Sequence, residues 1–331
     1  MAGKALVTGG TGFVGSAVLR KLIERGQEVK AFARPGSNRE NLRDLPVEVV
    51  EGDLKDAATW AKAFEGVNDL YHVAADYRLW VRDPDEMYRT NVAGTEGFIR
   101  AAADAGVERI VYTSSVATLG TVARGVPADE DTPVTLDDMI GHYKRSKYLG
   151  EEAVRRLAVE EKIDVVIVNP STPIGPRDVK PTPTGRMVLE AAKGKMPAYV
   201  DTGLNVVHVD DVAEGHILAR EKGKAGDRYV LGGKDMTLRE ILVEIAGIVN
   251  GKPPLMRLPA GAILPLAYGA EFAARLMPNW EPFVTVDGVK LAKKLMFFSS
   301  DKARSQLGYS ARPAREALVD AIGWFRESKL L

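Results

Sequence analysis

The chain has 331 residues, and its 45 Lys and Arg balance 45 Asp and Glu, so the formal net charge is zero. This balance gives no indication of a nucleic-acid partner or of binding to an anionic membrane. The sequence contains no cysteine, which excludes disulfides, thiolate catalysis and cysteine metal sites and fits a cytoplasmic protein. The N-terminus enters a strand without the basic and apolar segments of a secretory signal.

The first fifteen residues combine a short apolar strand, a glycine-rich turn and the start of a helix. The glycines fit two spacings, Gly10-x-Gly12-x-x-Gly15 and Gly9-x-x-Gly12-x-x-Gly15. Glycine lets the backbone turn tightly and approach phosphates, and a helix that begins near Phe13 directs unpaired N–H groups at the anion. A tight turn without a ligand is the alternative. The strand before the turn and the helix Ser16–Glu24 after it favour dinucleotide binding.

Apolar runs alternate with helical patterns through the first half of the chain. The predicted strands are Ala5–Thr8, Glu28–Ala33, Val47–Val50, Asp69–Val73, Arg109–Thr113 and Val165–Val168. The predicted helices include Ser16–Glu24, Ala57–Phe64, Asp85–Ala105 and Met139–Glu160. Strands separated by helices form right-handed crossovers, so we expect an α/β fold with a Rossmann-type, doubly wound parallel sheet.

Loop-forming residues gather after Asn169, where prolines and glycines are frequent up to Gly185. This composition indicates that the chain leaves the sheet for a smaller, mostly helical substrate lobe. The strand Val206–Val209 and the helix Asp210–Arg220 are expected to return to the sheet domain. We therefore expect residues 1–170 and 205–222 to form the dinucleotide-binding domain, and residues 171–204 and 223–331 to form the substrate-binding lobe.

One apolar segment, Ala260–Met277, requires comparison with a membrane helix. Pro265, Glu271 and Arg275 interrupt it, and its length lies at the lower limit for spanning a bilayer. The pattern favours a packed helix of the small lobe over an interfacial membrane helix, and it predicts no transmembrane segment.

The residue after the second predicted strand bears on the choice of dinucleotide. NAD-binding proteins commonly carry an acidic residue there, whereas this chain has Arg34. A guanidinium can pair with a 2′-phosphate, which favours NADP over NAD. Stacking of Arg34 on adenine, or exposure to solvent, is the alternative. Asp53, after the third strand, is positioned either to accept from the adenine amino group or to cap the next helix.

A tyrosine and a lysine lie four residues apart early in the long predicted helix. This spacing places Tyr143 and Lys147 on one helix face. A neighbouring ammonium and an oxidised nicotinamide both favour the phenolate, so we expect the phenol of Tyr143 to have a lowered pKa and to act as a general acid or base. Lys147 is also expected to contact the ribose hydroxyls.

The upstream strand that ends in Thr113, Ser114 and Ser115 supports this interpretation. Its hydroxyls fall at the carboxyl edge of a parallel sheet, where ligands bind in such folds. Ser115 can form a hydrogen bond with the reacting oxygen. Simple capping of the strand or turn is the alternative.

Together, the glycine turn, Thr113-Ser114-Ser115, Tyr143-x-x-x-Lys147 and Asn169-Pro170 resemble the extended short-chain dehydrogenase/reductase family over essentially the whole chain. Segments 74–80, 169–178 and 207–212 resemble most closely the hopanoid-associated sugar epimerases, which are themselves similar to dihydroflavonol 4-reductases. This set of motifs is highly specific for the superfamily and much less specific for the reaction.

The resemblance implies a role for each matching position. Tyr143 matches the acid/base, Lys147 its electrostatic partner and Ser115 the donor to the substrate oxygen. The expected dinucleotide contacts are Gly9, Thr11, Gly12, Phe13, Val14, Gly15, Arg34, Asp53, Leu54, Val73, Ala74, Ala75, Thr113, Tyr143, Lys147, Pro170 and Thr172. Asn91 matches a helix asparagine of the family, for which a structural role beside the site is expected.

Three functions compete for this chain. They are a carbonyl reductase that uses NADPH, a sugar or nucleotide-sugar epimerase with retained NAD, and a cofactor-sensing regulator without catalysis. Dehydratases of the family carry an Asp-Glu pair where this chain has Val116-Ala117, and epimerases that bind a nucleotide diphosphate commonly have an arginine at the position of Leu204. These two departures, together with Arg34, favour a reductase. The presence of Tyr143 and Lys147 argues against the regulator.

The expected partner is a small-molecule substrate. The sequence is also compatible with a homodimer. The predicted substrate contacts are Tyr77, Trp80, Ser115, Arg186 and His208. The lid is expected to combine the 76–84 insertion with the 180–186 loop. Ordinary rim positions are the alternative for Tyr77, Trp80 and Arg186, and a buried structural role is the alternative for His208. The four histidines form no spacing typical of a metal site.

Overall fold

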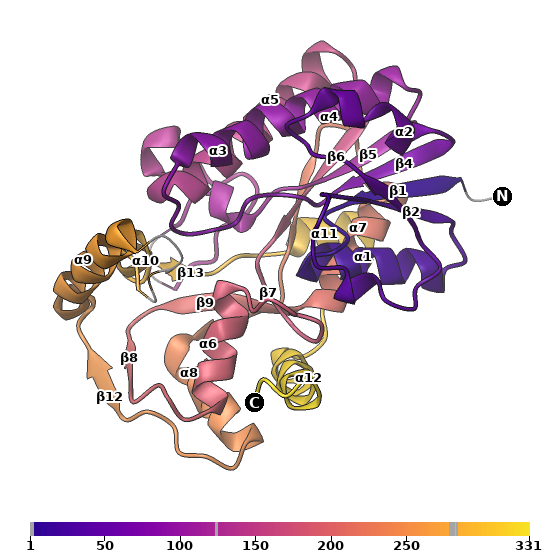
Figure 1. Cartoon of the computed structure of the whole chain (residues 1–331). Helices are drawn as coiled ribbons and strands as arrows, with labels where there is room; N and C mark the ends of the chain where they lie inside the picture. Colours follow the sequence, from indigo (N-terminus) through magenta and orange to yellow (C-terminus); the bar gives the residue numbers. More distant parts are fainter. Residues whose placement is uncertain (1–2, 123–124, 278–281, 283) are drawn as a thin grey trace.

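The computed structural model describes residues 3–122, 125–277, 282 and 284–331. Its main sheet is parallel and has the strand order β10-β6-β5-β4-β1-β2-β3 (Figure 1). The strands are β1 (Lys4–Thr8), β2 (Val29–Ala33), β3 (Glu48–Glu51), β4 (Val67–His72), β5 (Arg109–Thr113), β6 (Val165–Pro170) and β10 (Arg228–Leu231). The order reverses between β1 and β4, and a crevice for ligands forms at such a switch point. The expected Rossmann-type sheet is confirmed.

Helices cover both faces of this sheet and bury its apolar side chains in two separate layers. The helices of one layer are α1 (Phe13–Glu24), α7 (Val209–Lys222) and α11 (Asp301–Leu307). The helices of the other layer are α2 (Ala61–Phe64), α4 (Thr95–Asp104) and α5 (Gly141–Glu160). Because both faces are covered, the central strands consist almost entirely of buried residues.

A second, smaller lobe is built around β9 (Gly203–His208). This strand pairs with β7 (Thr172–Ile174), β11 (Lys234–Thr237) and β13 (Leu295–Met296). A separate pair is formed by β8 (Ala198–Val200) and β12 (Met256–Leu258). The helices α6 (Pro183–Ala192), α8 (Leu238–Ile248) and α12 (Ala314–Glu327) share one apolar core with this lobe.

Two strands lie in other sheets than the sequence indicated. The segment Val206–Val209 was expected in the main sheet, but β9 belongs to the sheet of the smaller lobe, and only α7 packs on the main sheet. The outer strand of the main sheet is instead β10, which lies beyond the expected boundary at residue 222. A short apolar run does not show which sheet it joins. The division into two domains stays a prediction.

The expected helix Asp85–Ala105 is interrupted. It consists of α3 (Pro84–Tyr88), a π-helical turn (Arg89–Gly94) and α4. A Cβ at Gly94 would lie 2.8 Å from the carbonyl oxygen of Leu54, so the helix passes close to the backbone of another segment there. The expected 180–186 loop is likewise shorter, because α6 begins at Pro183 with the Thr182 hydroxyl as its cap.

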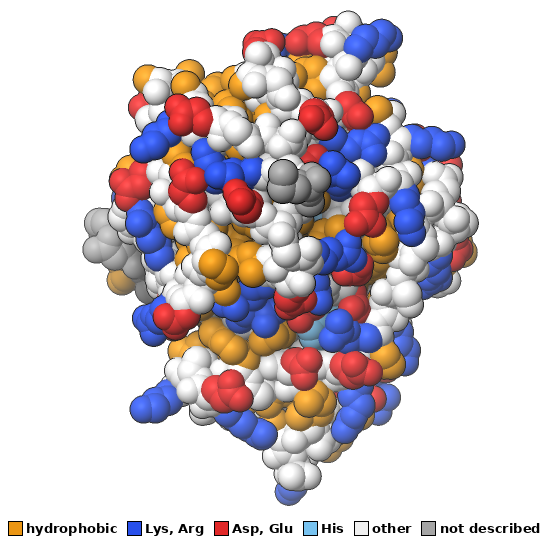
Figure 2. Space-filling view, turned by 90° about the vertical axis from the view of Figure 1, so that its right-hand side faces the viewer, with side chains coloured by type: hydrophobic (Ala, Val, Ile, Leu, Met, Phe, Trp, Pro, Cys, Tyr) orange, Lys and Arg blue, Asp and Glu red, His pale blue; other side chains and the backbone are white. Residues whose placement is uncertain are grey.

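The apolar segment near residue 260 forms α9 (Ala260–Leu276), which packs on α10 (Val286–Leu291). Ala267 and Ala274 are buried, whereas Tyr268 and Phe272 are exposed. Within the described ranges, no helix combines the length and the apolar character that crossing a bilayer requires. Figure 2 shows another face of the molecule, where positive and negative side chains are interspersed, in keeping with the zero net charge.

Candidate active site

The glycine turn lies at the carboxyl end of β1 and is held by close backbone contacts. The Gly12 N–H donates to the carbonyl oxygen of Gly9 over 2.9 Å, and Gly9 has a φ of 70°. A Cβ at Gly9 would lie 2.9 Å from the Cα of Ala74, and a Cβ at Gly15 would lie 2.2 Å from the Gly9 oxygen. Glycine is therefore required where the turn meets the end of β4 and the first turn of α1.

The first turn of α1 presents unpaired donors. Gly12 is the N-cap and offers no capping side chain. In the described part of the chain, the N–H groups of Phe13 and Val14 have no hydrogen-bond partner. The neighbouring Thr11 carbonyl accepts from the Asn41 side chain over 3.2 Å, which fixes the outer side of the turn. A narrow glycine cradle and free helix donors fit a diphosphate.

The residues expected at the adenosine end have different environments. Arg34 follows β2, is exposed, and its guanidinium has no hydrogen-bond or ion-pair partner among the described residues. The Asp53 carboxylate accepts from the N–H of Lys55 over 2.9 Å. The next helical turn is capped by Asp56 and not by Asp53, so the capping alternative is wrong. Leu54 is buried.

The end of β4 is tied to β1 through a buried hydroxyl. Thr8 Oγ1 accepts from the N–H groups of Val73 and Ala74 over 3.0 and 3.1 Å. The same hydroxyl lies 3.1 Å from Nδ1 of His72, which is buried between the aromatic rings of Phe98 and Tyr112. These bonds place Val73, Ala74 and the following Ala75 beside the glycine turn.

The residues Tyr143 and Lys147 lie one turn apart on α5, as expected. The side chain of Ser115, just beyond β5, lies close enough to the phenol of Tyr143 to act on its pKa. The ammonium of Lys147 donates to the Thr113 carbonyl over 2.9 Å and to the Tyr112 hydroxyl over 3.3 Å. The structure thus brings the expected tyrosine, lysine and serine together at the carboxyl edge of the sheet.

The charge states of this group differ from the expectation. Burial raises the pKa of Tyr143, and the hydrogen bond from Ser115 opposes this shift without reversing it. Burial also lowers the pKa of Lys147 to about 8, which the Glu151 carboxylate partly opposes. The expected lowering of the tyrosine pKa by the Lys147 ammonium is wrong for this structure, because the ammonium is directed at Thr113 and Tyr112.

The buried carboxylate of Glu151 accepts hydrogen bonds from several segments around the site. The sequence alone did not predict this residue. Glu151 Oε2 accepts from Ser114 Oγ over 2.5 Å, from Thr118 Oγ1 over 2.8 Å and from Asn169 Nδ2 over 2.8 Å. Its Oε1 accepts from Arg228 Nη1 over 3.0 Å. Glu151 lies one further turn along the face of Tyr143 and Lys147, and this spacing was the available signal.

The expected lid segment is anchored by Asn91. Its side chain forms hydrogen bonds with the backbone N–H and carbonyl of Asp76, over 2.7 and 2.8 Å, and with the Ser146 hydroxyl of α5 over 3.0 Å. The structural role expected for Asn91 is therefore supported. Tyr77 is exposed and Trp80 half-buried on this segment.

Two buried polar atoms without partners lie where β6 ends. They are Oδ1 of Asn169 and Oγ of Ser171, which flank Pro170 and precede Thr172. Buried polar atoms are normally hydrogen-bonded, so a donor from a ligand or water would satisfy these two atoms. The segment expected along the nicotinamide therefore offers unused hydrogen-bonding capacity.

Two of the expected contacts, Thr113 and His208, are engaged within the protein. Thr113 Oγ1 lies 2.8 Å from Nε2 of His216, so its hydroxyl is engaged within the core. Nδ1 of His208 accepts from the Asp210 N–H over 3.0 Å, and its Nε2 lies 3.1 Å from Asp320 Oδ2, which supports the structural alternative. Arg186 is exposed on α6. No cluster of His, Asp and Glu suited to a metal is present among the described residues.

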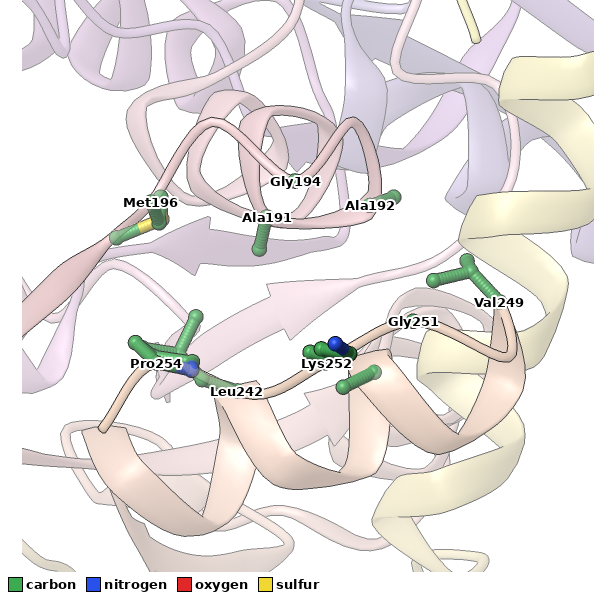
Figure 3. A pocket seen from close by; sticks show the side chains of 10 residues that line it. Ala191, Ala192, Gly194, Met196, Leu242, Val249, Gly251, Lys252 and Pro254 are labelled. Atoms are coloured by element: carbon green, nitrogen blue, oxygen red, sulfur yellow. The ribbon is translucent and has the colours of Figure 1, made fainter.

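A small hollow between α6 and α8 lies away from these groups (Figure 3). Its volume is about 60 Å³, and its lining includes Ala191, Met196, Leu242 and Lys252. Ligand pockets commonly measure roughly 300–1,000 Å³, so this hollow does not compete with the carboxyl edge of the sheet as a substrate site.

The fold and these groups define a dinucleotide-dependent enzyme of the Rossmann type. Residues 5–232 match the family described as NAD dependent epimerase/dehydratase. The chain belongs to this family, whose members include reductases, epimerases and dehydratases.

The relatives are similar over nearly the whole length. A putative dihydroflavonol 4-reductase of Synechocystis is 43% identical, covering 98% of this chain and 95% of the relative. Sterol demethylase protein B of Methylococcus capsulatus is 34% identical, covering 98% of this chain and 99% of the relative. The crystal structure of gox2253 superimposes with a TM-score of 0.88 at 54% identity, covering 98% of both chains.

Proposed function

We propose that this enzyme transfers hydride between a nicotinamide dinucleotide and a carbonyl or alcohol carbon of a small substrate. The observation that carries this proposal is that Ser115 acts on the Tyr143 phenol at the carboxyl edge of the sheet, with Lys147 one turn along α5. The 43% identity to a putative dihydroflavonol 4-reductase supports a reductase. Val116 and Ala117 follow Ser115 and cannot supply the acid and base that an elimination needs.

The residues present fit a dinucleotide. The glycine turn leaves no space for a Cβ at Gly9 or Gly15, and the N–H groups of Phe13 and Val14, unpaired within the described ranges, can bind a diphosphate. Arg34 would pair with a 2′-phosphate, so we propose NADP as the preferred form over NAD. When bound, the dinucleotide supplies or accepts the hydride.

The side chains of the site would hold the substrate oxygen and move its proton. Because burial raises the pKa of Tyr143, its phenol is protonated near neutral pH and can donate to the oxygen of a carbonyl group that is being reduced. The Ser115 hydroxyl donates a second hydrogen bond to this oxygen. Lys147, one turn along α5 from Tyr143, holds the end of β5 through the Thr113 carbonyl.

The test is a screen of the purified protein for oxidation of NADPH and NADH with a panel of carbonyl compounds. Mass spectrometry of any dinucleotide that the protein retains accompanies the screen. We expect turnover with exchangeable NADPH. Retained NAD without turnover would favour a sugar epimerase. The homodimer and the cytoplasmic location stay predictions from the sequence.

A further inference from the structure

The residue that follows Tyr143 is a buried lysine that has no oxygen partner among the described residues. The side chain of Lys144 lies in α5, and the residue is 6% exposed. The one hydrogen-bond contact of its Nζ within the described residues is the thioether sulfur of Met296, at 4.0 Å. A thioether is a weak acceptor, and an unpaired buried ammonium is costly.

The two other buried lysines show which partners a buried ammonium group has elsewhere in this structure. Lys30 donates to the Glu65 carbonyl over 2.8 Å and lies 3.7 Å from the Glu48 carboxylate. Lys147 donates to the Thr113 carbonyl and the Tyr112 hydroxyl. Lys144 lacks both kinds of partner among the residues described, so its environment is incomplete for a charged amine.

The surroundings of Lys144 are apolar and positively charged. Burial, followed by the charge of Lys294, lowers the pKa of Lys144 to about 8. Met296, which the amine contacts, packs against an apolar cluster that contains Val116, Leu119 and Phe298. An anion from outside the protein would stabilise the positive charges of Lys144 and Lys294.

The amine also contacts a part of the structure that adjoins the segment of Ser115. Tyr143 immediately precedes Lys144, and Val116, in the apolar cluster behind Met296, immediately follows Ser115. Met296 belongs to β13 in the sheet of the smaller lobe, and α5 covers the main sheet. Lys144 therefore reaches from a helix of the main sheet to a strand of the smaller lobe, and the apolar cluster behind Met296 includes the residue that follows Ser115.

We propose that Lys144 binds an anionic oxygen group of the substrate, a carboxylate or a phosphate, while Tyr143 and Ser115 hold the reacting oxygen. This inference rests on the proposed function, because it takes the reacting oxygen to lie at Tyr143. An oxyanion supplies both the acceptor and the opposite charge that Lys144 lacks. The substrates are therefore carbonyl compounds or alcohols that also carry a carboxylate or a phosphate.

The test measures binding and does not require turnover. The protein is saturated with oxidised dinucleotide, which blocks the diphosphate cradle, and is titrated by calorimetry with benzoate, its neutral analogue benzamide, and inorganic phosphate. Lys144→Met and Lys144→Arg are compared with Lys293→Met, the matched change at an exposed lysine. Because Lys144→Met replaces an unpaired buried cation with an apolar side chain of similar length, we expect it to fold, and its thermal unfolding is recorded.

We expect the wild type to bind benzoate or phosphate at least about tenfold more tightly than benzamide. Lys144→Met should lose this preference, Lys144→Arg should keep part of it, and Lys293→Met should keep all of it. Binding of benzoate alone assigns a carboxylate, and binding of phosphate alone assigns a phosphate. Equal binding of the three probes by the wild type, or an unchanged preference in Lys144→Met, would overturn the inference. Absence of dinucleotide binding would instead contradict the proposed function, and this inference with it.

Discussion

The carboxylate of Glu151 in α5 accepts a hydrogen bond of 2.5 Å from the hydroxyl of Ser114 at the end of β5. One turn earlier on the same helix, Lys147 donates to the carbonyl of Thr113. One turn earlier again, Tyr143 lies beside the side chain of Ser115. Three side chains spaced by four residues on α5 therefore face three consecutive residues at the end of β5, and the bonds of Glu151 and Lys147 fix the position of the helix against the sheet.

This arrangement makes Glu151 important for stability. Glu151→Gln removes the charge that pairs with Arg228 and replaces one accepting oxygen with a donor, so donors from other elements lose their acceptor. We expect the free energy of unfolding to fall by about 3 kcal/mol, as for other broken buried ion pairs. Denaturant unfolding measures it.

The control is Glu152→Gln, which affects an exposed pair with Arg155. An exposed pair three residues apart on a helix contributes less than about 0.5 kcal/mol. Equal stability of the two variants would show that the buried network does not hold α5 in place.

A second prediction concerns the free energy of unfolding at acidic pH. Burial lowers the pKa of His216 to about 4, and its Nδ1–H donates to the Val212 carbonyl over 2.7 Å. The unfolded chain binds this proton near pH 6.5 and the folded chain only near pH 4, so the contribution of His216 to stability is present above pH 6.5 and is lost as the pH falls towards 4.

Replacement of His216 by Gln should therefore weaken the dependence of the unfolding free energy on pH between about 4 and 6.5. The exposed His142 provides the control, since His142→Gln should leave this slope as in the wild type. Chemical denaturation at a series of pH values measures the slopes. The same slope in His216→Gln and in the wild type would show that this histidine is protonated in the folded chain.

A third prediction tests the choice of dinucleotide at Arg34. If its guanidinium pairs with a 2′-phosphate, Arg34→Ala should weaken NADPH binding by about 1.5–3 kcal/mol and leave NADH nearly unchanged. The wild type should prefer NADPH by at least about tenfold. Arg43→Ala, at a neighbouring exposed arginine, is the control. Equal losses for both dinucleotides would mean that Arg34 stacks on adenine, and NAD would then be the working cofactor.

Local patterns in the sequence predicted much of this site. The glycine turn, the alternation of strands and helices, and the spacing of Tyr143 and Lys147 depend on residues close together in the chain, and the structure places them as expected. The network of Glu151 was missed because its donors come from the segment after β5, from β6 and from β10, which the sequence separates widely. For the same reason, the pattern could not show that Lys147 would be directed at Thr113 and Tyr112.

The sequence also did not predict which sheet each short apolar strand joins. Both β9 and β10 are buried runs of a few residues, and tertiary pairing alone decides that one joins the smaller sheet and the other the main sheet. His208 illustrates the same limit for a site residue. Its capping of α7 is a local interaction, but its contact with Asp320 depends on the distant helix α12.

The central claim is that Tyr143 transfers the proton, and a single substitution tests it most directly. Tyr143→Phe removes the hydroxyl and keeps the ring, so dinucleotide affinity should stay within a few-fold of the wild type while kcat for the carbonyl substrate found in the screen is abolished. Parallel measurement of kcat and of the dinucleotide Kd separates the two effects. A variant that retains more than about a tenth of the wild-type kcat, a loss of less than roughly 1.4 kcal/mol, would contradict the assignment of Tyr143 as the general acid.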